Sequence, residues 1–253
     1  MIREQIQRLY FRKDGELASV QAACRRLRIL TERGYLTRLR LPVTQGSGPY
    51  VYQPGRGALL AFNEGRKKVV GPGARGRRVE SIAGLCHGLE VVDFYIAIKE
   101  GLESRGGRAL VWLGEGEVRY AFTHRGKRLV LSPDAYCLWA LGTEEGSFFL
   151  EWDRGTESMT RFAEKLQVYE AYYLVRGYHN HVGEMELRPR LLIVAPDERR
   201  EKKMVDWMAR RLGRGEFPSL PTVLVTARDL VHGDVLGPIW RRPGEEQRMR
   251  FVD

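Results

Sequence analysis

The sequence predicts a protein of mixed α and β structure (α/β, in an α+β arrangement) with two domains. Hydrophobic patterns in the first third give two helices and then a pair of strands. Residues 81–253 instead interleave helices with strands of a mixed sheet. A segment rich in Gly, Arg and Lys, residues 63–80, separates the two patterns. A chain of 253 residues has ample length for two domains with their own cores.

Residues 1–62 are expected to form the first domain. Apolar residues at helical spacing predict helices over residues 2–11 and 18–33, the second with Ser19 near its start and Gly34 just past its end. Alternating residues 35–41 predict a strand, which residues 50–52 pair with after a Gly/Ser loop. A short helix at residues 55–60 completes the domain. The buried face of the second helix is predicted to be Val20, Cys24, Leu27 and Leu30.

Two helices followed by a basic hairpin are typical of a winged helix-turn-helix. In that fold the second helix enters the DNA major groove and the hairpin touches the backbone. Gln21, Arg25 and Arg28 share a helix face and are predicted to reach base edges, while Arg38 and Arg40 are predicted to contact phosphates. The alternative is a solvated helix face beside a small protein-binding wing. The helix that usually opens such a domain is not evident before Ile2, so we expect either a trimmed domain or a start upstream.

The distribution of charge supports contact with nucleic acid. Residues 1–80 hold 17 Lys and Arg against 6 Asp and Glu, whereas residues 81–253 hold 25 against 26. The whole net charge of +10 therefore comes from the first third, which favours a nucleic-acid-binding region over a uniformly basic surface. Residues 63–80 are predicted to be a basic flexible linker, which either follows a DNA backbone or is simply solvated.

The second domain is expected to be a mixed sheet flanked by helices. Helices are predicted at residues 85–104, 156–173, 198–212 and 227–230, and strands at residues 108–113, 118–122, 127–131, 135–141, 147–152, 190–194 and 222–226. The charged run 198–203 is predicted to be a solvated helix face with i, i+4 pairs.

Acidic residues at two strand ends suggest a site where a divalent metal ion acts on a phosphate group. One strand ends at Pro133-Asp134-Ala135, and Glu151 and Asp153 lie on one face of a second strand, residues 147–153. Lys165 and Tyr169 share a face of the following helix. Two carboxylates can share Mg²⁺ or Mn²⁺ with phosphate oxygens, while a lysine neutralises developing charge. The predicted catalytic residues are thus Asp134, Glu151, Asp153 and Lys165, with Asp134 and Glu151 as metal ligands.

The same order of motifs resembles the PD-(D/E)XK nuclease superfamily, which implies a restriction-endonuclease-like domain over residues 81–253. The match falls at Pro133-Asp134, at Glu151 to Asp153 and at Lys165 to Tyr169. That pattern has Lys where this chain has Asp153, so Lys165 either replaces it from the helix or the site is inactive.

Nearly the full chain resembles the replication-relaxation family of bacterial plasmid and mobile-element proteins. The resemblance lies in residues 26–28, 34–36, 87–94, 133–136, 149–157, 162–166 with Tyr169, and 233–240. It implies DNA binding in plasmid replication, mobilisation or its control. Double-stranded DNA is the expected partner, together with other plasmid or mobile-element proteins.

Three functions are compatible with these features. The first is a double-stranded-DNA-binding protein whose nuclease-like domain scaffolds or assembles. The second is a metal-dependent endonuclease targeted by the winged helix, and the third is a transcriptional regulator. Buried or ion-paired Asp153 favours the scaffold, whereas a metal-bound acid beside a basic helix residue favours the enzyme.

Three cysteines without metal spacing predict reduced core thiols. No apolar run predicts a signal or membrane segment, so a cytoplasmic protein is expected.

Overall fold

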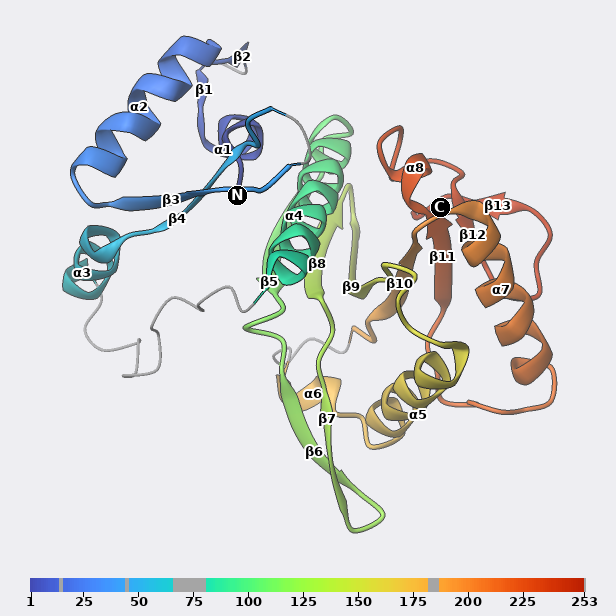
Figure 1. The fold of residues 1–253 in the computed structure, drawn as a ribbon. Coiled ribbons are helices and arrows are strands. Elements are labelled where there is room, and N and C mark those ends of the chain that lie inside the picture. The colour runs from blue at the N-terminus through green and yellow to red at the C-terminus, as the bar shows by residue number, and fades with distance from the viewer. Residues whose placement is uncertain (14–15, 44–45, 66–80, 182–186, 253) are drawn as a thin grey trace. The chain divides into compact units, whose positions relative to one another are not determined.

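A computed structural model gives the fold (Figure 1), and it describes residues 1–13, 16–43, 46–65, 81–181 and 187–252. The chain divides into two compact units, Met1–Ile96 and Ala97–Asp253, and each is described by itself. The division falls within a long helix, α4 (Ile82–Glu103), whereas the sequence predicted domains at 1–62 and 81–253. Most of the predicted linker, residues 66–80, lies outside the described residues. Those domain limits stay a prediction.

The first unit is built from helices and three short strand pairings. Its elements before α4 are α1 (Arg3–Tyr10), β1 (Arg12–Lys13), β2 (Glu16–Leu17), α2 (Val20–Glu32), β3 (Leu36–Arg40), β4 (Tyr50–Pro54) and α3 (Arg56–Gly65). β1 pairs with β2 and β3 pairs with β4, both antiparallel, and Ile2 forms a further antiparallel bridge to Val51. Buried Gln5 of α1 donates to the Asp93 carboxylate and to the Leu89 carbonyl of α4, both at 2.8 Å.

Helix α2 has clear end signals, and most of its surface is exposed. The Ser19 hydroxyl accepts a hydrogen bond from the Ala22 N–H at 3.2 Å, and Gly34 follows the helix with φ of 72°, a conformation that glycine adopts without strain. The buried residues of α2 are Ala23 and Leu27. The prediction that Val20 and Cys24 are buried was wrong, because the packed face is turned by one residue towards the smaller Ala23.

The second unit is organised around a seven-stranded mixed sheet. Its remaining elements are β5 (Arg108–Gly114), β6 (Tyr120–His124), β7 (Lys127–Leu131), β8 (Ala135–Leu141), β9 (Glu144–Trp152), α5 (Met159–Leu174), α6 (Tyr178–His181), β10 (Arg190–Ala195), α7 (Glu198–Leu212), β11 (Val223–Ala227), α8 (Arg228–Val231), β12 (Trp240–Arg241) and β13 (Arg248–Met249). The strand order is β13-β12-β11-β10-β9-β8-β5, with β6 and β7 forming a separate hairpin. The predicted class of mixed α and β structure is confirmed.

The sheet has a central block of parallel strands with antiparallel pairs on either side. The central strands β9, β10 and β11 are parallel, with Leu150 opposite Leu192 and Leu192 opposite Leu224. The outer pairs β5-β8, β8-β9, β11-β12 and β12-β13 are antiparallel. Near-continuous burial of the central strands fits a sheet that is covered on both faces.

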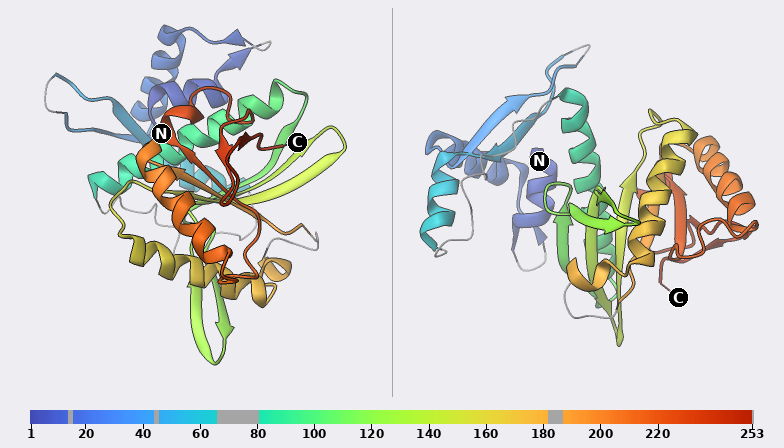
Figure 2. Two further views of the ribbon diagram at one scale, coloured as in Figure 1. Left: turned by 90° about the vertical axis from the view of Figure 1, so that its right-hand side faces the viewer. Right: turned by 90° about the horizontal axis from the view of Figure 1, so that it is seen from below.

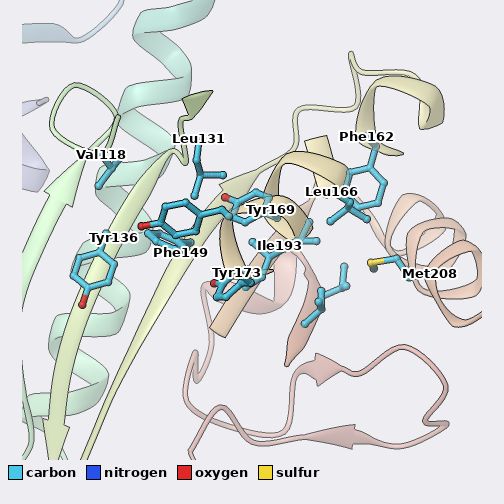
Figure 3. Close-up of a cluster of buried hydrophobic side chains, with 14 of the residues drawn as sticks. Val118, Leu131, Tyr136, Phe149, Phe162, Leu166, Tyr169, Tyr173, Ile193 and Met208 are labelled. Carbon is cyan, nitrogen blue, oxygen red and sulfur yellow. The ribbon is translucent and has the colours of Figure 1, made fainter. Parts of the chain in front are cut away.

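One face of the sheet carries a core rich in tyrosine. Helices α5 and α7 lie over this face (Figures 1 and 2), where Phe149 and Ile193 of the sheet join Leu166 and Tyr169 of α5 and Met208 of α7 in one buried cluster (Figure 3). On the opposite face Phe148 contacts Phe251 edge-on, with 5.5 Å between ring centroids. These two layers fix the end of β9 between them.

The cysteines are free, but only Cys137 is buried, so the expectation of three core thiols was wrong for exposed Cys24 and half-buried Cys86. Within the described ranges, no helix is both long enough and apolar enough to cross a membrane.

Candidate functional site

The strands β8 and β9 bring the predicted acids Asp134 and Glu151 to one edge of the sheet. Antiparallel pairing sets Ala135 opposite Leu150, so the residues just outside this pair are neighbours. The Asp134 N–H donates to the Leu150 carbonyl at 3.0 Å, and the Asp134 Oδ2 accepts from the Trp152 N–H at 2.7 Å. Asp134 therefore bonds the backbone on either side of Glu151.

Helix α5 adds Lys165 and Tyr169 to the Glu151 carboxylate. Ser158 caps this helix, and the spacing of one turn places both side chains on the face that meets the sheet. Lys165 Nζ lies 2.7 Å from Glu151 Oε2, and the Tyr169 hydroxyl donates to Glu151 Oε1 at 2.6 Å. Glu151 is only 5% exposed, so each of its oxygens is committed to a partner inside the protein.

Burial and the Glu151–Lys165 attraction together set the pKa values of this cluster. Desolvation raises the pKa of Glu151 to about 7, while the charge of Lys165 opposes the rise and the nearby charge of Asp134 adds to it. Burial by itself lowers the pKa of Lys165, but the attraction of Glu151 outweighs it and holds that pKa above its ordinary value. The lysine therefore stays charged, and the carboxyl titrates near neutral pH.

Asp153 takes a different partner from the other predicted site residues. Its Oδ2 lies 2.7 Å from Arg200 Nε on α7, and its Oδ1 accepts from the Gly155 N–H at 2.8 Å. The Asp153 side chain is 7% exposed, and that of Arg200 is 13% exposed. Arg200 also donates to the Glu157 carbonyl at 2.8 Å. The pair thus fastens the turn after β9 to α7.

The carboxylates at this site already have partners, which bears on whether a divalent cation could bind there. Mg²⁺ and Mn²⁺ prefer several free carboxylate or carbonyl oxygens. Among the residues that the structure describes, no group of three His, Cys, Asp or Glu could hold a metal ion. Glu151 faces a lysine and a tyrosine hydroxyl, and Asp153 faces an arginine, so these carboxylate oxygens already have partners within the protein. Mg²⁺ or Mn²⁺ at Asp134 and Glu151 stays a prediction.

The predicted DNA-contacting residues lie on accessible parts of the first unit. Gln21, Arg25 and Arg28 are exposed on α2, and Arg28 has only an exposed i+4 partner, Glu32, at 3.8 Å. Arg38 and Arg40 are exposed on β3, and the guanidinium carbon of each lies 4.3 Å from the centre of the Tyr50 ring. Such cation–π contacts pre-orient both arginines on the hairpin.

Two contributors were missed by sequence reasoning. Arg200 lies in the run 198–203, which was predicted to be a solvated helix face, yet it is half-buried and ion-paired with Asp153. Tyr50 was placed only as a strand residue, although it holds two arginines. Neither has a local signal, because each acts on residues at least ten positions away in the sequence.

A cleft of about 630 Å³ in the second unit lies away from Glu151 and Asp153. It opens where β10 and β11 begin, and its lining includes Arg188, Arg190, Phe217 and Arg242. Glu151 and Asp153 instead lie where β9 ends, which is the opposite end of these parallel strands. The volume of this cleft is therefore no argument for chemistry at Glu151.

Fold and site together define a two-unit α+β protein with a buried acid–lysine–tyrosine cluster at the edge of a mixed sheet. The sequence model of the replication-relaxation family matches residues 1–186, almost three-quarters of the chain. The chain belongs to the replication-relaxation family. Membership suggests a role in the replication or mobilisation of a plasmid or mobile element. No curated protein and no solved structure matches the chain.

Proposed function

We propose that this protein binds double-stranded DNA of a plasmid or mobile element and acts in its replication, mobilisation or the control of either. The observation that carries the proposal is the face of α2. This 13-residue helix buries only Ala23 and Leu27, while Gln21, Arg25 and Arg28 are exposed on it. A capped helix that presents basic and amide side chains suits the major groove.

The order of elements in the first unit supports a winged-helix mode of binding. α2 is followed directly by the antiparallel β3-β4 hairpin, which serves as the wing in this proposal. Gln21, in the first turn of α2, is proposed to read base edges together with Arg25 and Arg28. Arg38 and Arg40, stacked on Tyr50, are proposed to hold phosphates.

For the second unit we propose a scaffolding role rather than cleavage. The ion pair between Asp153 and Arg200 supports this choice, because a salt-bridged aspartate in this position helps to hold the turn after β9. Glu151 is likewise closed by Lys165 and Tyr169. The nuclease-like resemblance then reflects a shared architecture around an inactive site.

A DNA endonuclease is the second candidate, and one observation favours it. Asp134, Glu151 and Lys165 converge at one sheet edge, and the pKa of Glu151 is raised to about 7. Buried acids with shifted pKa values are common at catalytic sites. Under this candidate, substitution of Glu151 abolishes cleavage and leaves DNA binding intact.

Duplex binding by the first unit can be tested with fluorescence anisotropy over a range of salt concentrations. Arg25→Ala with Arg28→Ala is expected to weaken binding about tenfold or more, because each base-reading contact contributes about 1–3 kcal/mol. The matched control is Lys202→Ala with Lys203→Ala, which removes the same charge from exposed positions on α7. Equal losses from both double variants would contradict the assignment of binding to α2.

A further inference from the structure

The β6-β7 hairpin stands apart from the main sheet of the second unit. Its two strands pair only with each other within the described residues, from Tyr120 opposite Leu131 to His124 opposite Lys127. Figure 1 and the left-hand view of Figure 2 show the hairpin projecting as a narrow ribbon. Packing of the core does not by itself explain why the hairpin projects from the sheet.

The base of this ribbon is firmly anchored. Val118 and Leu131 are buried, and Tyr120 stacks on Tyr172 of α5 with 5.9 Å between ring centroids. Phe122 meets the same Tyr172 ring edge-on at 5.4 Å. These contacts hold one face of the hairpin against α5, so the ribbon extends from a fixed support.

The tip is a tight turn that suits a regular ribbon. Arg125 and Gly126 are the two residues between the strands, and their φ angles are 49° and 73°. Positive φ at both central residues is the signature of a type I′ turn, whose twist matches that of paired strands. The turn therefore keeps the ribbon regular to its end and presents Arg125 at the outermost position.

The charge of the ribbon is one-sided. Residues 118–133 contain Arg119, Arg125, Lys127 and Arg128 but no Asp or Glu. All four cations are exposed, and across the described ranges none of them makes an ion pair. Other cations of this unit, such as Lys165, Arg200 and Arg248, are matched to carboxylates. Uncompensated positive charge on a projection attracts polyanions.

We propose that the β6-β7 hairpin is a second DNA-binding element, a basic ribbon that contacts the phosphates of duplex DNA. A two-stranded ribbon fits the width of a DNA groove. The face away from α5 carries the smaller side chains of Ala121, Thr123 and Val130 beside Arg128, so bulky groups do not block a close approach. This inference rests on the proposed DNA binding and adds a second point of contact to it.

The test uses the full chain and the salt dependence of duplex binding. Arg125→Asn, Lys127→Gln and Arg128→Gln are combined, because Asn tolerates the positive φ of the turn and Gln keeps side-chain length. Each lost phosphate contact lowers the magnitude of the log–log salt slope by about 0.9, so we expect a decrease of about two to three. At about 0.15 M salt the affinity is expected to fall roughly 10- to 100-fold.

Two matched variants make the result specific. Arg199→Gln, Lys202→Gln and Lys203→Gln remove the same charge from exposed positions on α7, and they are expected to leave the slope unchanged. Lys127→Arg with Arg128→Lys keeps the charge of the ribbon and is expected to retain wild-type binding. Equal loss in the α7 variant would overturn the proposal, as would a wild-type slope in the hairpin variant.

The failure of this inference can be told apart from the failure of the proposed function. If the wild-type chain binds duplex DNA through α2 and the hairpin variant keeps its slope, the ribbon proposal alone is overturned. If the wild-type chain shows no salt-dependent duplex binding, both proposals are overturned. Equal thermal unfolding of the variants and the wild type shows that a lost contact, and not a lost fold, causes the change.

Discussion

At the scale of single residues, Glu151 is a buried acid of the second unit with a raised pKa. It is a carboxyl buried at the edge of a sheet, with a lysine and a tyrosine hydroxyl on its two oxygens. Desolvation favours its neutral form, whereas Lys165 favours the charged form. Burial prevails in this balance and raises the pKa of Glu151 to about 7.

This pKa predicts a definite pH dependence of stability. The folded-state pKa of Glu151 lies above its ordinary value of 4.5, so the folded protein holds the proton more tightly than the unfolded chain does. The stabilisation is therefore complete below about pH 4.5 and is lost as the pH rises through about 7. The total change is about 3 kcal/mol, from about 1.4 kcal/mol for each pKa unit.

Urea unfolding at several pH values measures this effect as the difference between the wild type and Glu151→Gln. That difference is expected to shift against the wild type as the pH rises. The matched control is Glu144→Gln, an exposed position on the same strand, which should leave the pH profile unchanged. A difference that grows in favour of the wild type with rising pH would mean that the charged Glu151–Lys165 pair dominates instead.

At the scale of elements, a buried ion pair fastens the last strands to α7. Glu201 of α7 is 1% exposed, and Arg248 of β13 meets both of its carboxylate oxygens, at 2.7 and 2.8 Å. β12 and β13 are two residues each, too short for their ladder hydrogen bonds to hold them alone. The bidentate pair supplies the missing attachment at this edge of the sheet.

Loss of Arg248 is expected to destabilise the second unit strongly. Arg248→Ala leaves the Glu201 carboxylate buried with only Arg241 nearby, and breaking such a pair costs about 3–5 kcal/mol. Chemical denaturation measures the loss. Arg242→Ala removes an exposed pair with Glu245 and serves as a control, with an expected cost of about 1 kcal/mol or less. Similar losses in the two variants would contradict the anchoring role of Glu201.

At the scale of the whole molecule, local patterns could predict most elements but not their long-range partners. The strands around Asp134 and Glu151 and the helix that carries Lys165 follow from strong periodicity, and β8, β9 and α5 lie where they were predicted. The strands β12 and β13 were missed because two residues give no periodicity. The pairing of Asp153 with Arg200 spans 47 positions, and only the packing of α7 on the sheet brings them together.

The distribution of charge divides the chain into regions with different proposed functions. Net positive charge is concentrated in residues 1–80, and a further local excess lies on the projecting β6-β7 hairpin. The acids of the candidate nuclease-like site are each matched to a partner in the second unit. We therefore propose that exposed basic elements contact DNA and that the sheet has a scaffolding role.

The most direct test of this division is incubation of supercoiled plasmid with the protein and Mg²⁺ or Mn²⁺, with DNA binding measured in the same mixtures. Wild type and Glu151→Ala are compared. Our account predicts that both proteins bind the plasmid and that both leave it supercoiled. Nicked or linear plasmid with the wild type, absent with Glu151→Ala, would contradict the account and establish the second unit as a nuclease.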